Sequence, residues 1–112
     1  MSFCLIILAG GNSHRFGSNI GKPYQKLGGK SLIEINVNKA LQFKAIKQII
    51  LVYNKKDSKK VKSLKLKNVK LISGGKSRRE STFNALKYLI KQKGINKVLI
   101  HDVARPNFSL RL

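Results

Sequence analysis

Residues 2–11 read Ser-Phe-Cys-Leu-Ile-Ile-Leu-Ala-Gly-Gly, an apolar run that ends in small residues. Apart from its first residue, Ser2–Leu8 contains no polar side chain, which is typical of a β-strand buried on both faces of a parallel sheet. Further near-continuous apolar runs of this kind occur at Lys47–Tyr53, Val69–Ser73 and Lys97–His101. The sequence therefore predicts a mostly parallel sheet of about four strands.

Segments with helical character separate these runs, at Ser31–Phe43, Asp57–Leu66 and Arg78–Lys93. Such strand–helix alternation favours right-handed βαβ crossovers. The expected fold class is α/β, a Rossmann-like three-layer sandwich with about three helices and a sheet that is incomplete, because doubly wound sheets usually continue beyond four strands.

Capping signals support two of these helices. Ser31 and Glu34 form a capping box, in which each side chain bonds the other residue's backbone N–H, and Ser77 and Glu80 repeat the pattern. In the third helix the spacing predicts a shared apolar face, and Gly94 follows as a stop signal. That face consists of Phe83, Leu86 and Ile90.

Composition limits the classes of protein to consider. A chain of 112 residues fits one small domain that needs no disulfide, and Cys4, its single cysteine, is expected to be buried and inert in a reducing cytoplasm. No apolar run reaches the length of a membrane span.

The net charge of +20 would attract any polyanion, so a nucleic-acid-binding module stays open as an alternative. The basic residues are mostly lysines that recur along the chain, without the interleaved aromatics of a base-stacking surface. We therefore interpret the charge as a general lysine bias and expect no nucleic-acid partner.

The loop after the first strand is rich in small residues, whose amides can approach phosphate oxygens. Gly10 and Gly11 match neither the Walker nor the dinucleotide pattern, so a plain tight turn also explains them. Arg15 and Lys22 flank the loop with the cations that a triphosphate requires. His14 has no neighbouring ligand residue and is expected to be a solvated loop histidine.

Two later segments carry candidate chemistry. Residues 74–82 join the third strand to the third helix, where a glycine turn and a cap suffice structurally but the helix N-terminus can also hold an anion or polar ligand. Asp102 stands at the tip of the fourth strand, where open α/β sheets bind their ligands, and it is one of only four acidic residues. It is the candidate carboxylate for a Mg²⁺ ion that bridges phosphate oxygens.

Together these segments resemble the 2-C-methyl-D-erythritol 4-phosphate cytidylyltransferase family of the sugar- and alditol-phosphate nucleotidyltransferases. The similar stretches are Leu-Ala-Gly-Gly-x-x-x-Arg-Phe-Gly from residue 8, Gly-Lys-Pro-Tyr-Gln from residue 21, Gly-Gly-x-x-Arg-x-x-Ser from residue 74 and His-Asp-Val-Ala-Arg-Pro from residue 101. The family order Pro-Lys-Gln is altered here, because Lys22 precedes Pro23.

The resemblance implies a role for each matching residue. Arg15 and Lys22 would be catalytic, Asp102 would bind magnesium (or another divalent cation) and, with Arg105, the acceptor substrate, and Arg78 would be structural. The implied nucleotide-binding residues are Leu8, Ala9, Gly10, Gly11, Gly75, Lys76, Ser81 and Val103.

The implied reaction is attack of a phosphomonoester oxygen on the α-phosphorus of CTP, with 2-C-methyl-D-erythritol 4-phosphate as acceptor, in non-mevalonate isoprenoid synthesis. Ribitol 5-phosphate is the alternative acceptor. Residues 1–112 would be the nucleotide-binding part of a single cytidylyltransferase domain, truncated at its C-terminus. A full-length member would be a homodimer, through an arm that these residues do not contain.

Overall fold

The computed structural model describes residues 3–9, 26–92 and 97–102 of the chain. Its main sheet contains β1 (Phe3–Ala9), β4 (Ile46–Tyr53), β5 (Val69–Ser73) and β6 (Lys97–Asp102). The spatial order is β5-β4-β1-β6, and every neighbouring pair is parallel. The predicted strands are confirmed, with bounds that differ by at most one residue.

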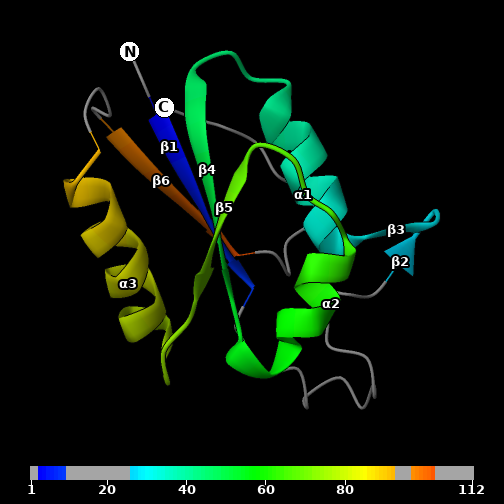
Figure 1. Cartoon of the computed structure of the whole chain (residues 1–112). Coiled ribbons are helices and arrows are strands. Elements are labelled where there is room, and N and C mark those ends of the chain that lie inside the picture. Colours follow the sequence, from blue (N-terminus) through cyan, green and yellow to red (C-terminus); the bar gives the residue numbers. More distant parts are fainter. Residues whose placement is uncertain (1–2, 10–25, 93–96, 103–112) are drawn as a thin grey trace.

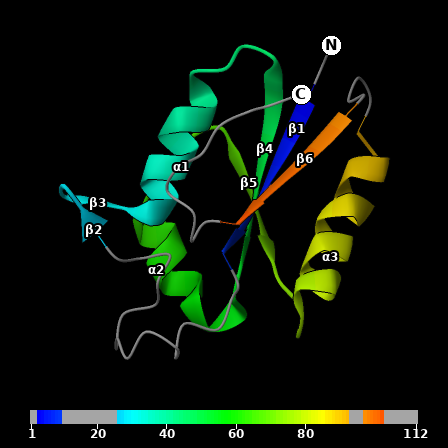
Figure 2. The ribbon, with the colours of Figure 1, turned by 180° about the vertical axis from the view of Figure 1, so that it is seen from behind.

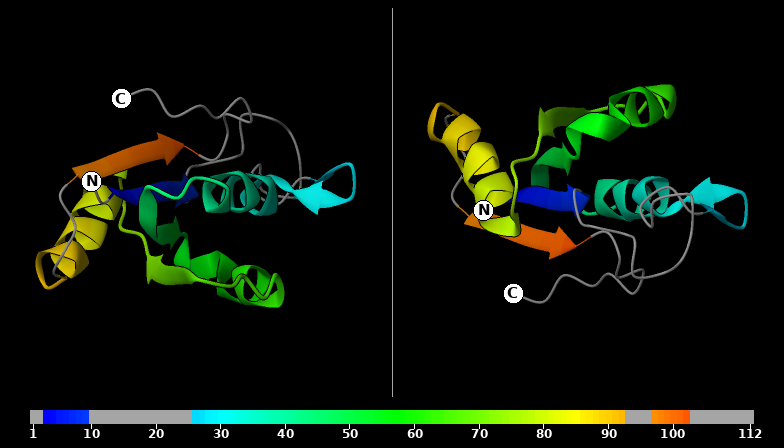
Figure 3. Two further views of the ribbon diagram at one scale, coloured as in Figure 1. Left: turned by 90° about the horizontal axis from the view of Figure 1, so that it is seen from above. Right: turned by 90° about the horizontal axis from the view of Figure 1, so that it is seen from below.

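Helices cover both faces of this sheet. In Figures 1 and 3, α1 (Leu32–Leu41) and α2 (Ser58–Ser63) lie on one side and α3 (Arg78–Ile90) lies on the other. This arrangement confirms the predicted three-layer α/β class. None of the helices in the described part of the chain combines the length and apolarity that crossing a bilayer requires.

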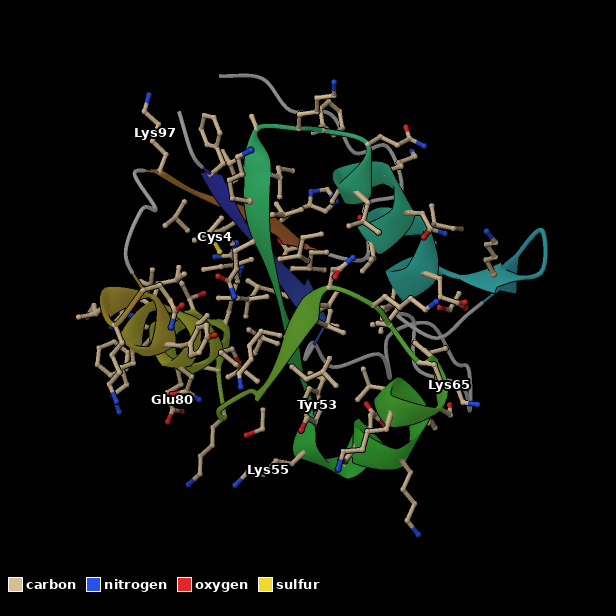
Figure 4. The ribbon with its side chains drawn as sticks, turned by 45° about the horizontal axis from the view of Figure 1, so that its top comes forward. Cys4, Tyr53, Lys55, Lys65, Glu80 and Lys97 are labelled. Carbon is tan, nitrogen blue, oxygen red and sulfur yellow. The ribbon has the colours of Figure 1, made fainter. Side chains whose placement is uncertain are left out.

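β1 is the central element of the core, because all seven of its residues are buried. Successive side chains of a strand point to opposite faces, so β1 contributes to two apolar clusters. Leu5 and Ile7 pack with α1 and α2, whereas Cys4, Ile6 and Leu8 pack with α3. Figure 4 shows the Cys4 side chain on the face of the sheet that α3 covers.

The two outer strands are less buried than their sequences predicted. β5 and β6 both carry exposed or half-buried residues, because each has a strand neighbour on one side only among the described residues. Val98 and Ile100 of β6 are exposed large apolar residues. Figure 2 shows β6 from behind, beside β1. An apolar run thus identified the strands correctly but did not separate central strands from outer ones.

The apolar face predicted for α3 does not pack against the sheet. Phe83, Leu86 and Ile90 are exposed, and Ile90 is 83% exposed. The face that contacts the sheet contains the small residues Ser81 and Ala85 together with Leu89. Small side chains let a helix lie close to the strands. The face of α3 that packs on the sheet is therefore the one with the small residues, not the one with the largest apolar side chains. The helix ends at Ile90, before the predicted Lys93, and the expected stop at Gly94 lies outside the described residues.

The capping box of α1 is confirmed. The Ser31 hydroxyl accepts a bond from the Glu34 N–H at 3.2 Å, and the Glu34 carboxylate accepts one from the Ser31 N–H at 3.1 Å. Ser31 also ends a hairpin of β2 (Lys26–Leu27) and β3 (Lys30–Ser31) that was not predicted. Its turn requires Gly28 and Gly29, whose φ angles are +62° and +87°.

The predicted helix Asp57–Leu66 is shorter than expected. A 3₁₀ turn, η3 (Lys55–Asp57), precedes the six residues of α2, and Asn54 caps the turn by accepting a bond from the Lys56 N–H at 3.2 Å. Of the α2 residues only Val61 is buried. A lysine-rich helix with one buried anchor has little tertiary packing to extend it, which explains its length.

Candidate functional site

A small cavity lies where the carboxyl ends of β1 and β6 meet the N-terminus of α3. The chain runs from β1 to β4 and β5 in one direction and then crosses back past β1 to β6. The strand order therefore reverses between β1 and β6, and open α/β sheets bind ligands at such a switch point. The described part of the cavity measures about 120 Å³ and is lined by Leu8, Gly75, Lys76, Ser77, Arg78, Ser81 and Asp102.

Parallel pairing places Asp102 in this cavity. Asp102 pairs with Leu8, and His101 pairs with Ile7. Residues in register share a face of the sheet, so Asp102 lies on the α3 face and His101 on the face covered by α1 and α2. The acid and not the neighbouring histidine therefore lines the cavity.

The glycine turn before α3 lies too close to the helix to accept side chains. The Gly74 N–H donates to the Tyr53 carbonyl at 2.7 Å, and the Gly75 N–H donates to the Ser81 hydroxyl at 3.1 Å. A Cβ on Gly74 would lie 2.7 Å from the Ser81 oxygen, and one on Gly75 would lie 2.4 Å from the Glu80 Cβ. The two glycines are thus needed to press this turn against the first turn of α3.

The cap of α3 differs from the predicted capping box. The Ser77 hydroxyl accepts the bond from the Glu80 N–H at 3.1 Å, as expected. The Glu80 carboxylate, however, accepts its bond from the Lys76 N–H at 3.0 Å, one residue earlier than a capping box requires. Glu80 therefore fastens the turn to the helix, and the amides of Gly75 and Lys76 already have partners on α3.

Asp102 has a cationic partner that the sequence did not predict. The Arg78 Nε atom lies 3.4 Å from the Asp102 Oδ1 atom. Both side chains are partly solvated, with exposed fractions of 63% for Arg78 and 38% for Asp102. The sequence assigned Arg78 only a structural role, and no local pattern links residues 24 positions apart. An arginine in the first turn of a helix is the available signal, because cations are disfavoured there unless an anion lies near.

The donor set limits how a divalent metal ion can bind. In the described ranges no group of three or more His, Cys, Asp or Glu residues comes together. Mg²⁺ is usually held by one or two carboxylates and completed by water and substrate phosphates. Asp102 could supply the single carboxylate of such an arrangement.

Cys4 is excluded from the site chemistry by its surroundings. The thiol is buried between β1 and α3, and burial raises its pKa to about 12. A thiol with such a pKa carries almost no thiolate at neutral pH, so it is not a nucleophile. The prediction of a buried cysteine is confirmed, and the raised pKa agrees with the expected lack of reactivity.

The sequence profile of 2-C-methyl-D-erythritol 4-phosphate cytidylyltransferase, IspD, matches residues 3–111. The chain belongs to the IspD family. The match confirms the resemblance on which the site prediction rests, and its range includes all the described residues that line the cavity.

Individual relatives agree with this assignment. The chain is 51% identical over its whole length to the bifunctional enzyme IspD/IspF of Pelagibacter ubique (strain HTCC1062), covering 30% of that protein. It is 44% identical over 108 residues to the 2-C-methyl-D-erythritol 4-phosphate cytidylyltransferase of Thermosipho melanesiensis, covering 90% of this chain and 46% of that protein. The fold matches the bifunctional IspDF of Campylobacter jejuni with a TM-score of 0.79 at 31% identity, over 97% of this chain and 28% of that one. The chain thus spans less than half the length of each of these relatives.

Within this IspD-family chain, the structure brings together five of the predicted site residues. These are Leu8, Gly75, Lys76, Ser81 and Asp102. Ala9 is buried in the cluster beneath α1, so its side chain does not line the cavity. The predicted residues Gly10, Gly11, Arg15, Lys22, Val103 and Arg105, and also His14, lie outside the described residues.

Proposed function

We propose that this chain carries the nucleotide-binding part of a CTP:2-C-methyl-D-erythritol 4-phosphate cytidylyltransferase. The observation that supports the proposal most strongly is the cavity at the sheet switch point. It joins Leu8, the Gly75–Ser81 turn and Asp102, three segments that all lie within the range that the family profile matches.

In the proposed reaction an acceptor phosphate oxygen forms a bond to the α-phosphorus of CTP. The bond from that phosphorus to the bridging oxygen breaks, and pyrophosphate leaves with the bonding electrons. The nucleophile is already anionic at neutral pH, so no general base is needed. Catalysis then rests on positioning and on stabilising the charge that develops on the α-phosphate.

Each site residue has a proposed share of this work. We assign Arg15 and Lys22 to charge stabilisation on the phosphates, and the turn at Gly75 and Ser81 to the cytosine end of CTP. Asp102 would hold Mg²⁺ together with the triphosphate and, with Arg105, orient the acceptor. A bound Mg²⁺ supplies Lewis-acid neutralisation of the phosphate charge.

The first test is nucleotide selectivity in calorimetric titrations of this chain with the four ribonucleoside triphosphates and Mg²⁺. We expect CTP to bind tightest, and Arg15→Ala and Ser81→Ala to weaken CTP specifically. Lys55→Gln, on the exposed η3 turn, removes a positive charge outside the cavity and serves as the control. Equal binding of all four nucleotides would contradict the CTP assignment.

The second test is turnover by a version extended to the length of the relatives, assayed for pyrophosphate release with both alditol phosphates. We expect 2-C-methyl-D-erythritol 4-phosphate to be the faster acceptor. Removing Arg15 or Lys22 should lower kcat by a factor of about 10²–10³. Preference for ribitol 5-phosphate would change the acceptor but retain the chemistry, whereas turnover of neither would reject the enzyme assignment.

A nucleic-acid partner makes a separable prediction. Binding through the lysines would fall steeply with salt and survive Arg15→Ala and Asp102→Ala. We expect added DNA or RNA to leave the CTP affinity unchanged at physiological salt.

We also propose a cytoplasmic location, which the single buried thiol supports. For the extended version we propose a homodimer, to be measured by light scattering.

A further inference from the structure

Asp102 and Arg78 form a charge pair within the cavity. Of the described residues that line it, Asp102 is the only acid, and Lys76 and Arg78 are the cations. Of these two cations, only Arg78 is within ion-pairing distance of the carboxylate, with 3.4 Å between Arg78 Nε and Asp102 Oδ1. The Asp102 carboxylate, which the proposed function assigns to a divalent cation, is therefore already paired with the Arg78 guanidinium.

Helix stability does not explain an arginine at this position. Arg78 is the first residue of α3, where the positive end of the helix dipole disfavours a cation. The cap of α3 is supplied by Ser77, and the turn is held by Glu80 and Ser81, so the Arg78 side chain takes part in neither set of bonds. The contact with Asp102 is the interaction that explains a cation at this position.

The geometry of the pair is that of a reversible contact. The bond uses Nε alone, at 3.4 Å, and is not the bidentate arrangement that makes arginine–carboxylate pairs strong. Both side chains retain access to solvent. Such exposed pairs alter an equilibrium by at most about fivefold, so an ion that binds Asp102 together with a triphosphate can displace the guanidinium.

We propose that Arg78 is a positioning residue that acts as an exchangeable counter-ion: it occupies the Asp102 carboxylate while the nucleotide is absent and yields it to the divalent cation that arrives with the triphosphate. The inference rests on the proposed function for the identity of that ligand. In the free protein the pair then weakens binding of the metal alone by up to about fivefold, which favours joint entry of metal and nucleotide.

The test is a titration of the nucleotide-free chain with Mn²⁺, followed by electron paramagnetic resonance of the unbound ion. Arg78→Gln removes the counter-ion. Arg79→Gln removes the same charge one residue along, from a side chain that lines the outer surface of α3 beside Phe83 and not the cavity. We expect Arg78→Gln to tighten Mn²⁺ binding about two- to fivefold relative to Arg79→Gln.

The Asp102→Asn background shows whether the effect of Arg78→Gln on Mn²⁺ affinity depends on the Arg78–Asp102 pair. There, Arg78→Gln and Arg79→Gln should bind Mn²⁺ equally weakly, because no carboxylate remains to be released. Two results would each overturn the proposal. One is equal Mn²⁺ affinity of the two arginine variants while Asp102 is retained, and the other is an Arg78→Gln effect that persists in the Asp102→Asn background.

Circular dichroism of each variant establishes that the fold is retained, as expected for a side chain that is 63% exposed. A parallel calorimetric titration with CTP and Mg²⁺ separates the two proposals. If wild-type protein fails to bind CTP, the proposed function fails, while the Mn²⁺ comparison still reports on the charge pair. If CTP binds normally and the Arg78→Gln effect is absent, only the counter-ion proposal fails.

Discussion

Gly75→Ala tests whether the close approach of the glycine turn to α3 is needed for the site. The new Cβ would lie 2.4 Å from the Glu80 Cβ, about 1 Å inside ordinary contact distance. The Glu80 Cβ is fixed to the helix backbone and cannot rotate away, so the turn itself must shift. Overpacking of this kind costs about 1–3 kcal/mol, and the lower chain entropy of unfolded alanine offsets about 0.4–1 kcal/mol.

We therefore expect Gly75→Ala to lower the free energy of unfolding by about 1–2 kcal/mol in urea titrations. Because the shift separates Gly75 from Ser81, CTP affinity should fall as well. Gly28→Ala is the matched control: its φ of +62° strains an alanine by about 1–2 kcal/mol, but no atom lies within 4 Å of the new Cβ and the hairpin is not part of the cavity. If the two variants lose similar stability but only Gly75→Ala weakens CTP binding, the close approach of the turn to α3 is needed for the site. Unchanged stability and CTP affinity in Gly75→Ala would refute it.

Three further predictions concern the fold. Leu89→Ala should destabilise the protein by about 2–5 kcal/mol in urea titrations, whereas Ile90→Ala should change its stability by less than about 0.5 kcal/mol, because Leu89 is buried and its neighbour is 83% exposed. Ser31→Ala should cost about 1–2 kcal/mol, measured as a lower urea midpoint, since its hydroxyl caps α1 and is buried. The Cys4 thiol should react with a thiol reagent at pH 8 only as fast as the protein unfolds. Burial raises its folded pKa from 9.0 to about 12, so the unfolded chain loses this proton first and stability should decline as the pH rises above about 9.

Local sequence patterns predicted those parts of the fold that depend on local interactions. The unbroken apolar run of β1 and the Ser31–Glu34 capping box are confirmed, because each reflects a requirement satisfied within a few residues. The β2–β3 hairpin was missed although Gly28 and Gly29 are a turn signal, since two-residue strands carry no periodicity. At the site, the apolar run predicted Asp102 at the carboxyl end of the fourth strand, and β6 ends there, with Asp102 in register with Leu8.

The features that were not predicted share a physical cause, which is that they depend on which surfaces face each other in three dimensions. Helix α3 has an apolar stripe at Phe83, Leu86 and Ile90, yet the small residues Ser81 and Ala85 face the sheet. Once Ser81 faces the sheet, helical geometry brings Arg78 to the same side one turn earlier, above the end of β6. The buried face of α3 and the Arg78–Asp102 pair are therefore two consequences of a single orientation of the helix. A sequence interpretation that chose the larger apolar residues as the buried face would rotate Arg78 away from Asp102, so the error in the core and the missed contact in the site have the same origin.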